Sequence, residues 1–133
     1  MRINFLIILI LLSSICLSKD KDNIAFQYGI LLRQTSNPDS IIVIENESIV
    51  NHRDRVKINV GYSPGSYFYV IFLDSDGIYV ELYFKKGLPS DSLYYDTALT
   101  WIGFNDSKGF ETFYFINSKD KLNDLNYIPK NIL

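Results

Sequence analysis

Two runs of aromatic and β-branched residues around a short polar turn constrain the fold of this chain most. Residues 67–73 (YFYVIFL) and 78–84 (IYVELYF) flank Asp74-Ser75-Asp76-Gly77. Such runs favour strands, and an Asp-Gly turn supplies the backbone geometry that a tight hairpin needs. The sequence therefore predicts a β-hairpin here. Because residues 67–73 are apolar at nearly every position, we expect a central strand that is covered on both faces.

The chain from residue 24 onward reads as further short strands separated by turn residues. We predict these strands at residues 24–34, 41–44, 48–50, 55–60, 97–104 and 111–117. In residues 55–60 the alternation of polar and apolar residues places Val56, Ile58 and Val60 on one buried face. Residues 85–96 are predicted to form a loop. A short helix is expected at residues 119–127, where Ser118 or Asp120 would cap it and Pro129 would stop it.

The number and spacing of these strands predict the fold class. About seven short strands with turns at regular intervals are typical of a sandwich or barrel. No helical crossover lies between the predicted strands, so their pairing should be mostly antiparallel. We therefore expect one all-β domain over residues 24–133, a small antiparallel β-sandwich with a short C-terminal helix.

The N-terminal residues have the layout of a secretory signal peptide. Arg2 supplies a positive charge, residues 5–12 are continuously apolar, and small residues follow. The apolar stretch is shorter than the ~20 residues that a membrane-spanning helix needs. Cleavage after Ser18 is predicted. Residues 1–18 would then be the signal, 19–23 a charged leader, and the localisation secreted or periplasmic.

Cys16 allows an alternative, because it could instead be the lipid-attachment residue of a lipoprotein anchored at the envelope. The residue before it is Ile15, whereas lipoprotein peptidases usually require a small residue at that position. Cys16 is the only cysteine. Its removal with the signal would leave a domain without disulfides or thiol nucleophiles, held together by its apolar core.

The charge of the chain argues against nucleic acid as a partner. The chain has 13 Lys and Arg residues and 15 Asp and Glu residues. Loss of Arg2 with the signal removes one positive charge, so the formal net charge moves from −2 to −3. Neutralising phosphates requires concentrated positive charge, and the sequence presents no dense basic cluster. Lys85-Lys86 is interpreted as a solvated pair.

The residues with reactive side chains do not form a recognisable catalytic or metal-binding motif. His52 is the only histidine, so neither a zinc-type ligand set nor a serine triad can be argued. Residues 74–77 resemble the start of a calcium loop, but a hydrophobic strand follows at once and a turn is preferred. Glu81 and Glu111 could form a carboxylate pair for glycoside hydrolysis, which is one alternative function. We predict no catalytic residues, no metal and no cofactor.

Three aromatic residues in or near the predicted loop are candidates for ligand binding. Exposed Tyr94, Tyr95 and Trp101 could stack on sugar rings, which would make the chain a carbohydrate-binding module. The alternative is that they cover the open end of the sandwich core. Aromatic residues of this density are found more often in that structural role.

Residues 49–122 resemble the bacterial domain of unknown function 4384. The resemblance rests on a series of short motifs in a fixed order: Asp54-Arg55-Val56-Lys57-Ile58, Ser66-Tyr67-Phe68-Tyr69-Val70, Asp74-Ser75-Asp76-Gly77, and Gly109-Phe110-Glu111-Thr112-Phe113-Tyr114 closing at Ser118. One departure is Tyr83-Phe84-Lys85-Lys86-Gly87, where the family has a sequence similar to Phe-Pro-Asn. The resemblance implies an exported bacterial domain and assigns no catalytic residues.

These observations together predict a secreted, non-catalytic β-sandwich that acts as a binding or interaction module of the bacterial cell envelope. Its partner would be a protein or an envelope polymer. The alternatives are a carbohydrate-binding module that uses the loop aromatics and an envelope hydrolase with paired carboxylates.

Overall fold

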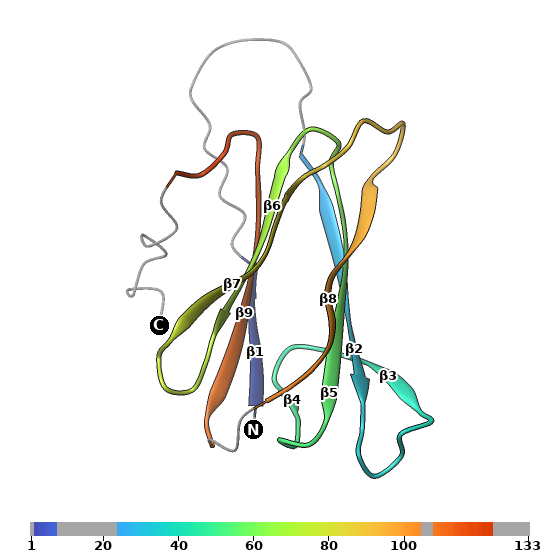
Figure 1. The fold of residues 1–133 in the computed structure, drawn as a ribbon, viewed down its shortest axis with the longest axis vertical. Helices are drawn as coiled ribbons and strands as arrows, with labels where there is room; N and C mark the ends of the chain where they lie inside the picture. Colours follow the sequence, from blue (N-terminus) through green and yellow to red (C-terminus); the bar gives the residue numbers. More distant parts are fainter. Residues whose placement is uncertain (1, 8–23, 105–107, 124–133) are drawn as a thin grey trace.

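The fold is all-β, as predicted, in a computed structural model that describes residues 2–7, 24–104 and 108–123. These residues contain nine strands and no helix. Figure 1 shows the strands in two layers that face each other, with strands far apart in sequence lying side by side. The predicted sandwich is confirmed.

The strands divide into a five-stranded and a four-stranded sheet. Sheet A has the order β4-β1-β9-β6-β7, and sheet B has the order β3-β2-β5-β8. All pairings are antiparallel except that of β1 with β9, which is parallel. The strands are β1 (Arg2–Ile7), β2 (Phe26–Arg33), β3 (Ile41–Ile44), β4 (Ser48–Ile49), β5 (Arg55–Tyr62), β6 (Tyr67–Leu73), β7 (Tyr79–Lys86), β8 (Tyr94–Gly103) and β9 (Phe110–Ser118).

The main core lies between the sheets and follows the period-2 alternation of the strands. Val56, Ile58 and Val60 of β5 are 0–2% exposed, as their spacing predicts. They pack with apolar residues of both sheets, including Phe113 and Phe115 of β9. Burying a large apolar side chain contributes about 1.5–3 kcal/mol, so this cluster stabilises the contact between the two sheets.

The predicted hairpin forms and places β6 inside sheet A. The Asp74 carboxylate accepts hydrogen bonds from the backbone N–H groups of Asp76 and Ile78, at 3.0 and 2.8 Å. Gly77 adopts φ +83°, a conformation that glycine reaches without the steric cost of a side chain. Strands β7 and β9 flank β6, so the expected central position of residues 67–73 is confirmed.

A second apolar cluster lies on the other face of sheet A. It contains Tyr69, Ile71, Leu73, Tyr114 and Ile116, with Tyr67 and Leu122 packed against it. The backbone N–H of Leu122 donates a hydrogen bond to the Tyr69 hydroxyl at 2.9 Å. Residues 119–123, which include Leu122, do not form a helix, so the helix prediction is wrong there. The rest of the expected helix, residues 124–127, lies outside the described residues.

Part of the predicted signal peptide is a strand of the sandwich. Arg2–Ile7 forms β1, which lies between β9 and β4 in sheet A (Figure 1). The predicted domain, residues 24–133, did not include this strand. Residues 8–18 and the charged leader 19–23 lie outside the described residues, and cleavage after Ser18 stays a prediction. Among the described residues, no helix is long and apolar enough to cross a membrane.

The predicted loop is shorter than residues 85–96. β7 continues through Lys86, and β8 already begins at Tyr94. Tyr94 and Tyr95 therefore stand on a strand, where the alternation of side chains sends them to opposite faces of sheet B.

Candidate functional site

The outer face of sheet B gathers the polar and aromatic side chains that are candidates for binding. Inward residues of β2, β5 and β8 fill the core, so the residues between them face away from sheet A. The outward residues named below form a surface that we call the outer face: Gln27, Gly29, Leu31, Arg33, Arg55, Lys57, Asn59, Gly61, Tyr95, Thr97 and Trp101.

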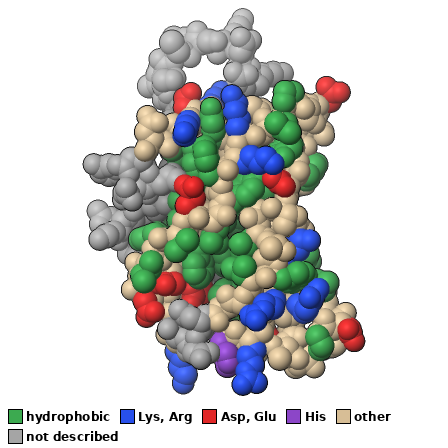
Figure 2. Space-filling model, in the orientation of Figure 1, with side chains coloured by type: hydrophobic (Ala, Val, Ile, Leu, Met, Phe, Trp, Pro, Cys, Tyr) green, Lys and Arg blue, Asp and Glu red, His purple; other side chains and the backbone are tan. Residues whose placement is uncertain are grey.

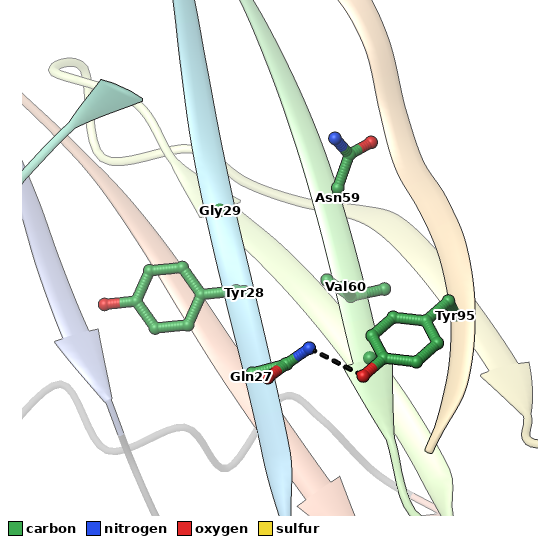
Figure 3. Close-up of a pocket in the computed structure, with 7 residues that line it drawn as sticks. Gln27, Tyr28, Gly29, Asn59, Val60 and Tyr95 are labelled. Atoms are coloured by element: carbon green, nitrogen blue, oxygen red, sulfur yellow. Dashed lines mark hydrogen bonds between the residues drawn. The ribbon is translucent and has the colours of Figure 1, made fainter. Parts of the chain in front are cut away.

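One end of the outer face is built around Tyr95. Gln27, Gly61 and Tyr95 are register partners on β2, β5 and β8. The Tyr95 ring lies directly over Gly61, where an added Cβ would be 2.6 Å from the ring. The Gln27 amide nitrogen donates a hydrogen bond to the Tyr95 hydroxyl at 2.9 Å, as Figure 3 shows. The ring is thus fixed at its edge while 61% of the residue stays exposed.

A shallow trough lies beside this ring. It has a volume of about 220 Å³, and its lining residues include Gly29, Asn59 and Tyr95 (Figure 3). Gly29 has no side chain to fill it, and nothing lies within 4 Å of where its Cβ would be. Pockets for drug-sized ligands measure about 300–1,000 Å³, so the trough suits one ring or one side chain of a longer ligand.

The other end of the outer face carries Trp101. The Arg33 guanidinium carbon lies 4.2 Å from the centre of the Trp101 ring, which is a cation–π contact. Arg33 stands six residues after Gln27 on β2. At about 3.3 Å per residue the Tyr95 and Trp101 ends are ~20 Å apart. The outer face therefore suits an extended ligand better than a compact one.

Three basic residues lie next to one another on this face. Arg33 and Arg55 are register partners, and Lys57 follows Arg55 on the same side of β5. Like charges directly opposite each other destabilise a strand pair. Among the described residues no carboxylate lies within 4 Å of any of the three, and Figure 2 shows Lys and Arg side chains gathered near the start of β5. We call Arg33, Arg55 and Lys57 the basic row.

The predicted ligand-binding aromatics are divided between two faces. Tyr95 and Trp101 share the outer face. Tyr94 instead turns inward, where its ring packs edge-on against Tyr62 with centroids 5.5 Å apart. Lys85 lies 5.2 Å from the centre of the Tyr94 ring. The structure thus brings two of the three residues together on one surface and gives the third a packing role.

A chain of hydrogen bonds ties the two sheets together near Tyr94. The hydroxyls of Tyr62 and Tyr83 lie 2.8 Å apart, and Tyr83 donates to Asp96 at 2.8 Å. Lys85 also bonds Asp96, at 3.0 Å. Burial alone would raise the pKa of Asp96, but the bonds from Lys85 and Tyr83 lower it below its usual value. Burial and the bond to Tyr62 raise the pKa of Tyr83, so this hydroxyl stays protonated.

Neither of the two carboxylates proposed for hydrolysis lines the trough on the outer face. Glu81 is exposed on β7, whereas Glu111 is 1% exposed at the start of β9. Burial raises the pKa of Glu111 to about 7, and the nearby Asp74 adds to this effect. A raised pKa suits a general acid. However, the described trough is on the outer face of sheet B, and no residue that lines it is a carboxylate.

His52 lies exposed in the turn at residues 51–54. Asp54 holds that turn, because its buried carboxylate accepts hydrogen bonds from the backbone N–H groups of Thr35 and Asn51. Within residues 2–7, 24–104 and 108–123, no three His, Cys, Asp or Glu side chains are placed to hold a metal ion.

The basic row is the feature that reasoning from sequence missed. Arg55 and Lys57 alternate with buried residues, and this spacing already indicated that they share one exposed face. Arg33 lies next to Arg55 only because β2 pairs with β5, and the sequence did not reveal this pairing. The sequence, which shows no run of basic residues, therefore did not reveal that these three cations share one face.

Comparisons with protein-family models, with curated proteins and with solved structures give no match to this chain.

Proposed function

We propose that this chain is an exported, non-catalytic binding module of the bacterial cell envelope, and that its outer face binds an extended anionic polymer. The polymer would carry carboxylate or phosphate groups on a sugar or polyol chain. The basic row would neutralise these groups, and the trough beside Tyr95 would take up one ring or unit. Export through the N-terminal signal, with a lipid anchor at Cys16 as the alternative, is part of this proposal.

The basic row is the observation that supports the proposal most. A chain with a net charge of −2 places three cations together on one sheet face without neighbouring carboxylates among its described residues. Like charges at opposing positions are unfavourable in a strand pair, and a bound anionic group would offset the repulsion between Arg33 and Arg55. Arginine binds carboxylate and phosphate groups in a bidentate manner, and it is less strongly hydrated than lysine.

Binding of soluble polyanions to the full chain tests the proposal. Polygalacturonate and polyglycerol phosphate serve as probes, with neutral dextran for comparison, in calorimetric titrations at several salt concentrations. We expect both polyanions to bind, with affinity that falls as salt rises, because binding releases counterions. The double variant Arg33→Gln/Lys57→Gln should weaken binding and reduce the salt dependence.

The matched control is Lys86→Gln together with Lys121→Gln. This pair removes the same charge from residues near Tyr67 and Phe84, away from the outer face. Equal loss of binding in both double variants would show that only net charge matters. Tighter binding to a single-stranded oligonucleotide than to either polymer would contradict the proposed ligand class.

A neutral glycan is the second candidate ligand, because Tyr95 and Trp101 lie on the same face. Planar aromatic side chains offer apolar stacking area at low entropic cost. In this case dextran or a peptidoglycan fragment should bind without salt dependence and change the fluorescence of Trp101. Tyr95→Ala should abolish this binding, whereas Tyr79→Ala on sheet A should leave it intact.

Mass spectrometry of the N-terminus tests export. A chain beginning at Lys19 supports cleavage after Ser18, and an acylated Cys16 supports the lipoprotein alternative. A chain that still carries residues 1–18 would contradict both.

A further inference from the structure

β1 occupies a position inside sheet A and not at its edge. Six of its residues pair in parallel with β9, from Arg2 opposite Phe110 to Ile7 opposite Phe115. On its other side, Arg2 and Ile3 pair with β4. β1 therefore fills a slot one strand wide between β9 and β4 (Figure 1).

Removal of β1 would open this slot along the core. Phe113 and Phe115 of β9 are 0% exposed, and they stand at the register positions of Phe5 and Ile7. β9 would keep β6 on one side and lose its neighbour on the other. An open strand edge has a row of unpaired N–H and C=O groups, and such an edge pairs readily with another strand. Cleavage after Ser18, which is part of the proposed function, would have this consequence.

The geometry of the slot restricts what can fill it. An inserted strand must have both edges free, because β9 borders one side and β4 begins on the other. The edge strands β3, β8 and β7 each have one edge already paired. A folded second copy therefore cannot insert any of these three strands.

The remaining segments of this sequence also lack a suitable run. Ile3–Ile7 of β1 is uncharged and free of proline over five residues. Residues 19–23 carry four charges, and residues 124–133 are interrupted by Pro129, so their longest uncharged and proline-free run is residues 125–128.

We propose that, in the exported protein, the slot between β9 and β4 binds an extended strand donated by another protein. This inference rests on the export proposed above and names a second, protein partner. The donated strand would be uncharged, free of proline and about five residues long, with bulky apolar residues opposite Phe113 and Phe115. It would run parallel to β9, and backbone hydrogen bonds would supply much of its affinity.

A peptide that copies β1 tests this binding. The probe has the sequence Arg-Ile-Asn-Phe-Leu-Ile followed by two lysines for solubility, and it is added to the exported chain. We expect it to slow hydrogen exchange of the β9 amides that face the slot by about tenfold or more, and to raise Tm. If the exported chain folds only partly without a strand, refolding with the peptide should restore the same β9 protection.

The control is a peptide in which prolines replace Asn4 and Phe5. Successive N–H groups of a strand point to opposite edges, so this change removes at least one donor towards β9 and fixes φ at two positions. Equal protection by this control would overturn the proposal, as would failure of the first peptide to protect β9. The proposal is also overturned if the exported chain retains residues 2–7, or if the β9 amides of the monomer are already protected from exchange without any peptide.

Sedimentation distinguishes a second copy from a different protein. If β9 protection appears together with a concentration-dependent dimer, the occupant is another copy of this chain and the proposed foreign strand is wrong. Polymer binding by the outer face is measured separately with the Arg33 and Lys57 variants. Failure of strand binding in the slot therefore does not affect the test of polymer binding by the outer face, and the reverse is also true.

Discussion

The buried carboxyl of Glu111 should make the stability of this fold depend on pH. The residue is 1% exposed, and its Oε2 atom has no hydrogen-bond partner among the described residues. Burial raises its pKa from 4.5 to about 7, and the charges of Asp74 and Asp76 act in the same direction. The polar groups of Ser75 lower the pKa but do not offset burial.

The sign of the effect follows from the higher pKa in the folded state. Below pH 4.5 both states are protonated and Glu111 imposes no penalty. Between pH 4.5 and about 7 the unfolded chain releases its proton first, so the free energy of unfolding falls as pH rises. Above pH 7 the penalty is constant. One pKa unit corresponds to 1.36 kcal/mol, so a rise of this size costs about 3 kcal/mol.

Glu111→Gln removes the ionisable group and keeps the shape of the side chain. Urea unfolding at pH 5 and pH 8 should show that the wild-type chain loses about 2.5 kcal/mol more than the variant over this interval, because part of the penalty is already present at pH 5. Glu81→Gln, at an exposed site of β7, is the matched control and should behave like the wild type. If Glu111→Gln has the same pH dependence as the wild-type chain, Glu111 is not the group responsible.

Three further substitutions test the packing. Gly61→Ala should destabilise the fold by about 1–3 kcal/mol, because the new Cβ meets the Tyr95 ring; adding Tyr95→Ala should restore part of this loss in urea unfolding. Gly77→Ala should lower the free energy of unfolding by about 1 kcal/mol, because its φ of +83° disfavours a side chain; equal stability would contradict this account of the turn. Tyr83→Phe should cost about 1.5–3 kcal/mol, because it removes a hydrogen bond to the Asp96 carboxylate; a loss below 0.5 kcal/mol would show that the network is dispensable.

The strand pattern was predictable because it depends on short-range periodicity. Residues 41–44 form a strand with the predicted bounds, and the strand at 55–60 extends only to Tyr62. Both follow from β-branched residues or from strict alternation bounded by turn residues. The hairpin around Gly77 needs only local geometry, so the sequence was sufficient there as well.

The candidate site was harder to predict because it depends on pairing between strands. The sequence predicts that Tyr94 and Tyr95 lie together in a loop. β8 begins three residues earlier than the predicted strand, so both residues lie on it and their side chains point to opposite faces of sheet B. Arg33 reaches Arg55 and Trp101 only after β2, β5 and β8 take their places in sheet B. Register is set by long-range packing, and no local pattern in this chain indicates it.

The segment Arg2–Ile7 shows why one sequence pattern can support two different structures. An export signal requires an apolar run, and a strand inside a sheet requires the same property because both of its faces are covered. These two roles compete for the same residues. If the signal is removed as proposed, the exported chain loses a strand that separates β9 from β4. Sheet A then stays open along β9 until another strand fills the place, so the order of cleavage, folding and partner binding would determine when this module becomes complete.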